Sequence, residues 1–244
     1  MAGRVHHFSV SGLYEGLFVM RDEESRSQWL HYTGECIQGE HAGSALPMLP
    51  TTLTSWKAFR ALHPTGTTID RESSWWRRLA GRIAGARDMA LPFGLPPLFT
   101  NTMRARDTRL KDNELGLGVV LGQRSLLRRT SALAARFYPF KAFKQQPLVH
   151  DTLGDVPLVL AWDAVAHAVA AFDTRLDGSP LRLRLDDQHL VDEGSGARFD
   201  LVGRCVQGAF KGQRLAAMPG LSTRWYGFSQ TYPNTTIYAP VSAT

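Results

Sequence analysis

The sequence is poor in cysteine and contains no long apolar run. Only Cys36 and Cys205 occur among 244 residues, which excludes a small domain held together by disulfides. No stretch of 18 apolar residues is present, so we expect no transmembrane helix. Residues 1–7 lack the apolar core of a signal peptide. These absences predict a cytoplasmic protein, with any membrane contact limited to the periphery of a bilayer.

The motifs of several enzyme classes are also missing. The sequence has no Walker loop, no His-Glu-x-x-His, no zinc-knuckle spacing and no Ser/His/Asp order. We therefore expect no metal and no cofactor, and whether the protein is an enzyme stays open. The net charge of +6 permits an acidic partner. Arginine clusters such as 77–78 and 128–129 lack an accompanying nucleic-acid module, so nucleic acid is not the expected partner.

The chain contains an internal repeat. When the sequence is shifted by 169 residues, residues 34–68 align without a gap on residues 203–237, and 12 of 35 positions are identical. Unrelated sequences would match at roughly two of these positions. The identical pairs include Cys36 with Cys205 and Trp56 with Trp225.

The repeat divides the chain into three parts. Residues 1–70 form a partial first unit, residues 71–114 a connection, and residues 115–244 a complete second unit. The second unit is complete because residues 115–190 have no counterpart in the first copy.

Each unit is predicted to be a small curled sheet closed by one short helix. Residues 8–11 and 181–185 alternate apolar and polar side chains, which is typical of half-buried strands. Residues 54–62 and 223–231 are predicted helices. The predicted fold class is α+β, mainly β, with two pseudo-repeated units joined by a basic crossover helix.

The connection carries the basic charge. Residues 71–144 contain 15 lysines and arginines against 5 acidic residues, and residues 73–87 are predicted to form an amphipathic helix. Such a helix can lie on an anionic membrane or a protein partner, or it can pack its tryptophans across the two units. The residues that would make the membrane or partner contact are Trp75, Trp76, Arg77, Arg78 and Arg82.

Motifs along most of the chain resemble those of a known family. The first copy carries Ser11-Gly12-Leu13-Tyr14, Ser27-Gln28-Trp29 and Thr33-Gly34-Glu35; the second carries Arg136-Phe137-Tyr138-Pro139, His150-Asp151 and Phe172-Asp173. In number and order these motifs resemble a prokaryotic domain-of-unknown-function family, number three thousand one hundred and seventy-nine. The resemblance covers nearly the whole chain except residues 71–100.

One departure from the family pattern concerns cysteine. The family's complete first unit contains a Tyr-Cys-Pro-x-Cys segment that this sequence lacks, and in the second copy Asp163 and Ala166 stand where the cysteines would be. A cysteine pair at that spacing can bind a metal or form a disulfide, and this chain can do neither by that route. The resemblance therefore implies a truncated or degenerate member, or one whose missing segment lies on another polypeptide or upstream of a misplaced start codon.

The polar and aromatic residues at family positions are the candidate ligand-binding residues. We expect a small-molecule-binding protein or a non-metallo enzyme, with its site in the groove between the units. The competing interpretations are that these residues are hairpin and core residues, and that the protein is a non-catalytic scaffold or membrane-peripheral partner protein using the Trp/Arg helix. The candidates are Ser11, Tyr14, Asp22, Trp29 and Thr33 in the first copy, and Asp163, His167 and Asp173 in the second.

Overall fold

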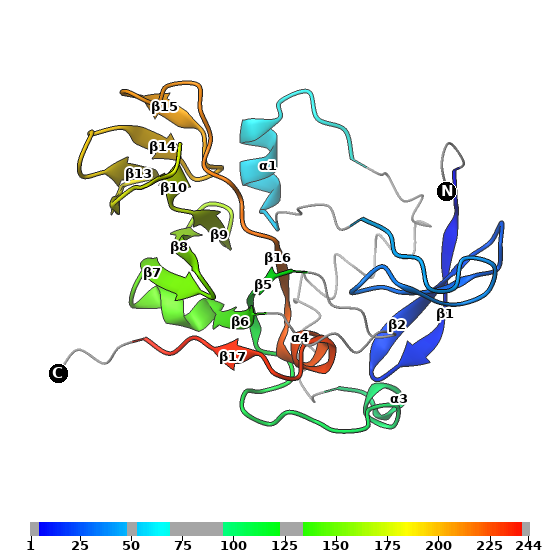
Figure 1. The fold of residues 1–244 in the computed structure, drawn as a ribbon. Coiled ribbons are helices and arrows are strands. Elements are labelled where there is room, and N and C mark those ends of the chain that lie inside the picture. The colour runs from blue at the N-terminus through cyan, green and yellow to red at the C-terminus, as the bar shows by residue number, and fades with distance from the viewer. Residues whose placement is uncertain (1–4, 48–52, 69–94, 123–133, 241–244) are drawn as a thin grey trace, which may run out of the picture.

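The computed structural model describes residues 5–47, 53–68, 95–122 and 134–240. These residues form a mainly β structure with several sheets and a few short helices (Figure 1), as the sequence predicts.

The first sheet is an antiparallel meander with the order β1-β2-β3-β4. Glu15 and Gly16, both with positive φ, make the turn between β1 and β2, as a tight hairpin connection requires. Trp29 and Leu30 of the middle strand β3 are almost completely buried. The strands are β1 (Phe8–Tyr14), β2 (Leu17–Asp22), β3 (Gln28–Leu30) and β4 (Cys36–Gln38).

The rest of the chain forms three further main sheets in contact with one another. One has the order β16-β5-β6-β17, the next β7-β8-β9 and the last β12-β13-β14-β15, with a small hairpin, β10-β11, beside them. The elements are β5 (Leu115–Leu121), β6 (Ala134–Pro139), the 3-10 helix η1 (Phe140–Lys144), β7 (Leu148–Leu153), β8 (Val156–Asp163), β9 (Ala168–Asp173), β10 (Arg175–Leu176), β11 (Ser179–Pro180), β12 (Leu183–Asp186), β13 (His189–Asp192), β14 (Arg198–Asp200), β15 (Cys205–Gln207), β16 (Gly220–Arg224) and β17 (Thr236–Ile237).

Strand β8 is the centre of this arrangement. Leu158 and Leu160 belong to the core shared with β5 and β6, whereas Val159 and Ala161 belong to the core shared with β12–β15. Successive side chains of a strand point to opposite faces. The continuous apolar run of β8 is therefore what a strand between two cores needs.

The β12–β15 meander has the strand order of β1–β4 and places its cysteine in the same way. Cys36 begins β4 and Cys205 begins β15; both are buried and free. Each thiol donates to the main-chain oxygen two residues later, at 3.3 Å. Burial raises the pKa of Cys36, which disfavours the reactive thiolate. Both cysteines thus act as small buried side chains.

The two predicted helices are present but have different surroundings. They are α1 (Trp56–Leu62) and α4 (Trp225–Thr231). Trp225 is fully buried and its ring contacts Phe137, whereas Trp56 is 57% exposed and stacks on Phe59. Helix α4 packs against β5 and β16, but α1 lies against the turn between β8 and β9, where the Ser55 hydroxyl donates to the Val165 carbonyl. The expectation that each unit is closed by its own helix is therefore not confirmed for α1.

The described part of the connection starts at residue 95 and contains a short helix, α3 (Pro97–Thr100). Its Phe99 ring contacts Phe18 of β2 and Tyr226 of α4, at centroid distances of 5.5 and 6.3 Å. The predicted basic helix with Trp75, Trp76, Arg77, Arg78 and Arg82 lies outside the described residues. Within the described ranges, none of the helices combines the length and apolarity that a membrane span requires.

Candidate functional site

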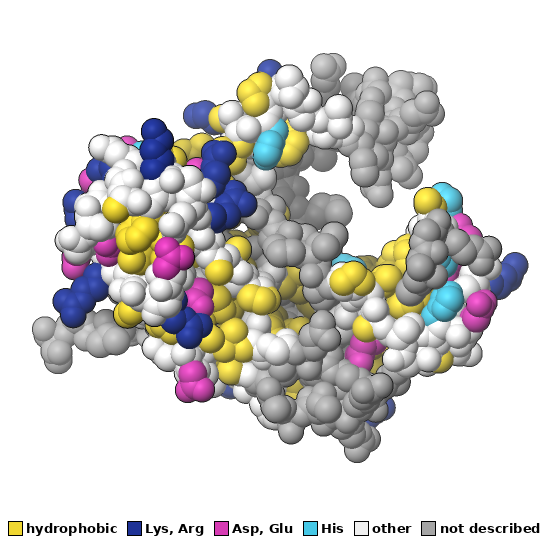
Figure 2. All heavy atoms as spheres, turned by 45° about the horizontal axis from the view of Figure 1, so that its top comes forward, with side chains coloured by type: hydrophobic (Ala, Val, Ile, Leu, Met, Phe, Trp, Pro, Cys, Tyr) yellow, Lys and Arg dark blue, Asp and Glu magenta, His cyan; other side chains and the backbone are white. Residues whose placement is uncertain are grey.

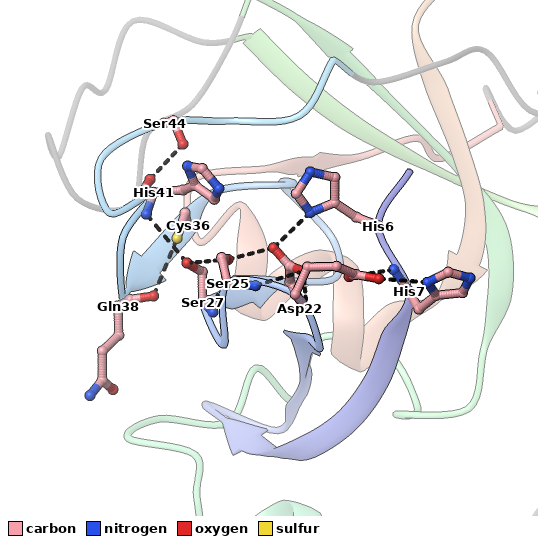
Figure 3. Close-up of polar contacts among 10 residues, drawn as sticks. His6, His7, Asp22, Ser25, Ser27, Cys36, Gln38, His41 and Ser44 are labelled. Carbon is pink, nitrogen blue, oxygen red and sulfur yellow. Dashed lines mark hydrogen bonds and ion pairs between the residues drawn. The ribbon is translucent and has the colours of Figure 1, made fainter. Parts of the chain in front are cut away.

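A polar cluster lies where β2 turns into β3 (Figure 3). Asp22, the last residue of β2, is fully buried. Its carboxylate accepts hydrogen bonds from the backbone N–H groups of Glu24 and Ser25, at 3.0 and 3.4 Å, and from the Ser25 hydroxyl at 2.5 Å. The Asp22 N–H donates to the Ser27 carbonyl at 2.9 Å. An aspartate that binds N–H groups two and three residues on makes an Asx-type turn, which explains why β2 ends here.

Two histidines from the segment before β1 bind this turn. His6 Nδ1 donates to Asp22 Oδ2 at 2.9 Å, and the His6 side chain is only 11% exposed. His7 forms two hydrogen bonds to the Glu24 carboxylate, one from Nδ1 at 2.6 Å and one from its backbone N–H at 2.9 Å. Figure 2 shows histidine side chains gathered with acidic ones on the lobe formed by the first meander.

A third histidine comes from the loop after β4. The His41 N–H donates to Ser27 Oγ at 3.3 Å. Its ring centroid lies 6.0 Å from that of His6 and 6.0 Å from that of Trp29. Two ring nitrogens on these neighbours, His6 Nε2 and Trp29 Nε1, are buried and have no hydrogen-bond partner among the described residues. Buried polar atoms are normally paired, so these two nitrogens are exceptions within the described structure.

The hydrogen bonds of the cluster favour the ionised form of its two carboxyl groups. Burial alone would raise the pKa of Asp22, but hydrogen bonds from Ser25 and His6 outweigh it and hold that pKa well below its usual range. The hydrogen bond from His7 lowers the pKa of Glu24, and Glu24 in turn raises the pKa of His7. Both carboxylates are therefore ionised at neutral pH.

The turn at the same place in the β12–β15 meander has some of these residues and lacks others. Asp192 ends β13 and accepts from the Ser195 N–H and hydroxyl, at 2.8 and 2.6 Å, as Asp22 accepts from Ser25. Phe8 pairs with Asp22 as Leu183 pairs with Asp192, which fixes the correspondence of the flanking residues. The Asp and Ser are common to both turns. The residues that differ are His6 for Leu181, Glu24 for Gly194, Ser27 for Ala197 and His41 for Phe210.

The structure distributes the sequence-predicted residues of the first copy over the meander. Asp22 and Trp29 belong to the polar cluster. The Ser11 hydroxyl donates to the Val19 carbonyl within the β1–β2 pair, the Thr33 hydroxyl donates to Glu35, and Tyr14 is partly exposed at the end of β1. These three are hairpin and turn residues, with no described contact to the cluster.

The three candidates of the second copy have local roles. Asp163 and His167 do not lie on a helix, because residues 164–167 are the turn between β8 and β9. The Asp163 carboxylate accepts from the N–H groups of Val165 and Ala166, both at 2.8 Å, and His167 has a positive φ. Asp173 is paired with Arg175 at 2.6 Å. Among the described residues, no hydrogen bond or ion pair joins this set to Asp22 or Trp29.

Sequence reasoning missed His6, Glu24, Ser27 and His41. One signal was available: the gapless alignment places His41 on Phe210, a polar residue opposite an apolar one in otherwise similar segments. A comparison of the positions at which the two copies differ would therefore have identified His41.

Comparison with known proteins identifies the family. No curated protein and no solved structure matches this chain. The sequence profile of one family, described as "protein of unknown function (DUF3179)", matches residues 1–235. Since this match covers nearly the full sequence, the chain belongs to the DUF3179 family.

Proposed function

We propose that this protein binds a small ligand, and that the ligand is held at the turn between β2 and β3 by the histidine–carboxylate cluster, defined as His6, Asp22, Glu24 and His41. The proposal keeps the ligand-binding function expected from the sequence but places the site at one end of the first meander. Asp163, His167 and Asp173 are assigned to their turn and ion-pair contacts instead.

We also infer that the two meanders are copies of one ancestral unit, with residues 1–70 and 115–244 as the two copies and residues 71–114 as their connection. The shared strand order, the buried cysteines and the Asp/Ser turns support this inference. Structural residues are then those that both copies keep, and residues with a separate task are those that one copy has changed.

One observation carries the functional proposal. The first copy has a histidine, a carboxylate, a hydroxyl and a second histidine at positions where the second copy has leucine, glycine, alanine and phenylalanine. Burying polar groups costs free energy unless they are paired, and the second copy forms the same turn without them. The turn itself does not require these four side chains, and binding a polar ligand would give them a task.

The charge of the cluster indicates the kind of ligand. Two ionised carboxylates lie beside His6, whose Nε2 has no described partner. The site therefore suits a small cation or a small molecule rich in hydrogen-bond donors. The alternative of a membrane-peripheral scaffold rests on residues 75–82, which lie outside the described residues.

Native mass spectrometry of the full chain, purified from its own host, tests the proposal. We expect a retained small ligand on the wild type and its loss from the double variant His6→Leu/His41→Phe, which installs the residues of the second copy. His150→Leu is the matched control, because His150 is exposed on β7 and should retain the ligand. A wild type without a retained ligand, or equal retention by the double variant, would count against the proposal.

A further inference from the structure

We infer that the histidine–carboxylate cluster is a site for one divalent transition-metal ion of the zinc class, with His6, Asp22 and Glu24 as its protein ligands. This inference rests on the proposed function and names the ligand of that site.

The positions of the donor atoms support three ligands. A ring nitrogen of His6 and carboxylate oxygens of Asp22 and Glu24 all lie within 4.8 Å of one another, and His6 Nδ1 is 2.9 Å from Asp22 Oδ2. With bonds of about 2.0–2.2 Å to nitrogen and oxygen, the ligand atoms of a tetrahedral zinc site are roughly 3.3 Å apart. Small side-chain movements would bring these atoms to such spacings.

The supporting contacts are those of a built site. Ser25 Oγ donates to Asp22 Oδ2, and Ser27 Oγ lies 2.8 Å from Ser25 Oγ. His7 orients the Glu24 carboxylate through two hydrogen bonds, one from its ring and one from its backbone N–H. Hydrogen bonds of this kind orient the ligands of metal sites. The two groups whose loss would leave the Asp22 turn intact, His6 and Glu24, are also the two that the second copy lacks.

The donor types select the class of ion. Calcium and magnesium prefer sites made entirely of oxygen, whereas an imidazole with carboxylates suits zinc and its neighbours in the transition series. Three protein ligands leave a fourth position for water or a bound molecule. The ion would neutralise the two carboxylates that the cluster otherwise keeps ionised.

Calorimetric titration of the chelator-treated full chain with Zn²⁺ tests the inference. We expect one equivalent to bind to the wild type and to His150→Leu, and affinity to fall at least about tenfold in His6→Leu and in Glu24→Gln. A parallel titration with Mg²⁺ should show no stoichiometric binding. The apo variants should fold like the wild type, because Leu181 and Gly194 occupy these positions in the second copy; their circular dichroism and Tm check this.

The outcomes separate the metal from the broader proposal. Unchanged Zn²⁺ binding in His6→Leu and Glu24→Gln, or no stoichiometric binding to the wild type, overturns the metal site. If an organic ligand is nevertheless retained by the wild type and lost from His6→Leu/His41→Phe, the proposed function stands without the metal. If neither is seen, both are rejected.

Discussion

The hydroxyl of Tyr32, in the turn between β3 and β4, is hydrogen-bonded to Thr223 Oγ1 in β16, although 191 residues separate them in the chain. Burial raises the pKa of Tyr32 to about 12 against a smaller opposite effect of Thr223, so the hydroxyl stays protonated at neutral pH. A Cβ at Gly227 of α4 would lie 2.1 Å from Tyr32 Oη. The pair therefore fixes the first meander against β16 and α4.

Removing this hydrogen bond should destabilise the protein. We expect Tyr32→Phe and Thr223→Val each to lower the free energy of unfolding by about 1–2 kcal/mol, because each leaves a partly buried hydroxyl without its partner. The double variant should lose less than the sum of the two, which denaturant titrations of all four proteins would show. Strictly additive losses would mean that the two hydroxyls do not interact.

A side chain at Gly118 should be far more damaging than one at Gly12. A Cβ at Gly118 would lie 2.0 Å from Phe228 Cε2, whereas a Cβ at Gly12 meets nothing within 4 Å. We expect Gly118→Ala to cost about 1–3 kcal/mol or more through overpacking, and Gly12→Ala to stay within about 0.5 kcal/mol of the wild type. Thermal unfolding of the two variants decides, and equal Tm values would refute the contact between β5 and α4.

The matched tryptophans of the two helices should respond differently to truncation. Trp225→Ala empties a buried position and should cost about 3–5 kcal/mol. Trp56→Ala removes a largely exposed ring, so we expect a change of no more than about 1 kcal/mol. Denaturant titration measures both, and a large loss in Trp56→Ala would show that α1 is covered in solution.

The contribution of Asp192 to the stability of the protein should depend on pH in the acidic range. Burial alone would raise the pKa of Asp192, but hydrogen bonds from Ser195 and from the backbone N–H of Arg182 lower it below its usual value. The folded-state pKa thus lies below the unfolded one, so the stabilisation is fully present above about pH 4 and is lost as the pH falls through the folded-state pKa. Asp192→Asn should be less stable than the wild type by about 1–3 kcal/mol at pH 7.

That difference should shrink when unfolding is measured at pH 3 and below. Asp155→Asn, at an exposed position between β7 and β8, is the control and should change little at either pH. A deficit in Asp192→Asn that is the same at pH 7 and at low pH would contradict the linkage.

The sequence predicts the local structure well because its signals are local. The alternation of residues 8–11 and the helical pattern of residues 54–62 predict strand β1 and helix α1. Asp163 and His167 are four residues apart but share no helix face, because that stretch is a turn between two strands that pair along their length. Alanine-rich composition does not distinguish a helix from a buried hairpin, since both contain small apolar residues.

His6 could not be predicted because its correspondence with the second copy depends on hairpin length. Phe8 and Asp22 pair across 14 positions, but Leu183 and Asp192 pair across 9. A gapless comparison therefore cannot set His6 beside Leu181. The position of α1 was equally hidden, because its contact with Val165 depends on how two distant segments pack.

The turns at Asp22 and Asp192 take their hydrogen bonds from their own hairpins and from the residues just before the preceding strand. Because such a turn depends on few contacts outside its hairpin, the other side chains of the turn can be exchanged without changing the tertiary packing around it. A chimera that receives residues 193–197 in place of residues 23–27 would retain the fold and lose the Glu24 carboxylate. The reverse exchange would introduce a carboxylate at position 194, in the turn of the β12–β15 meander.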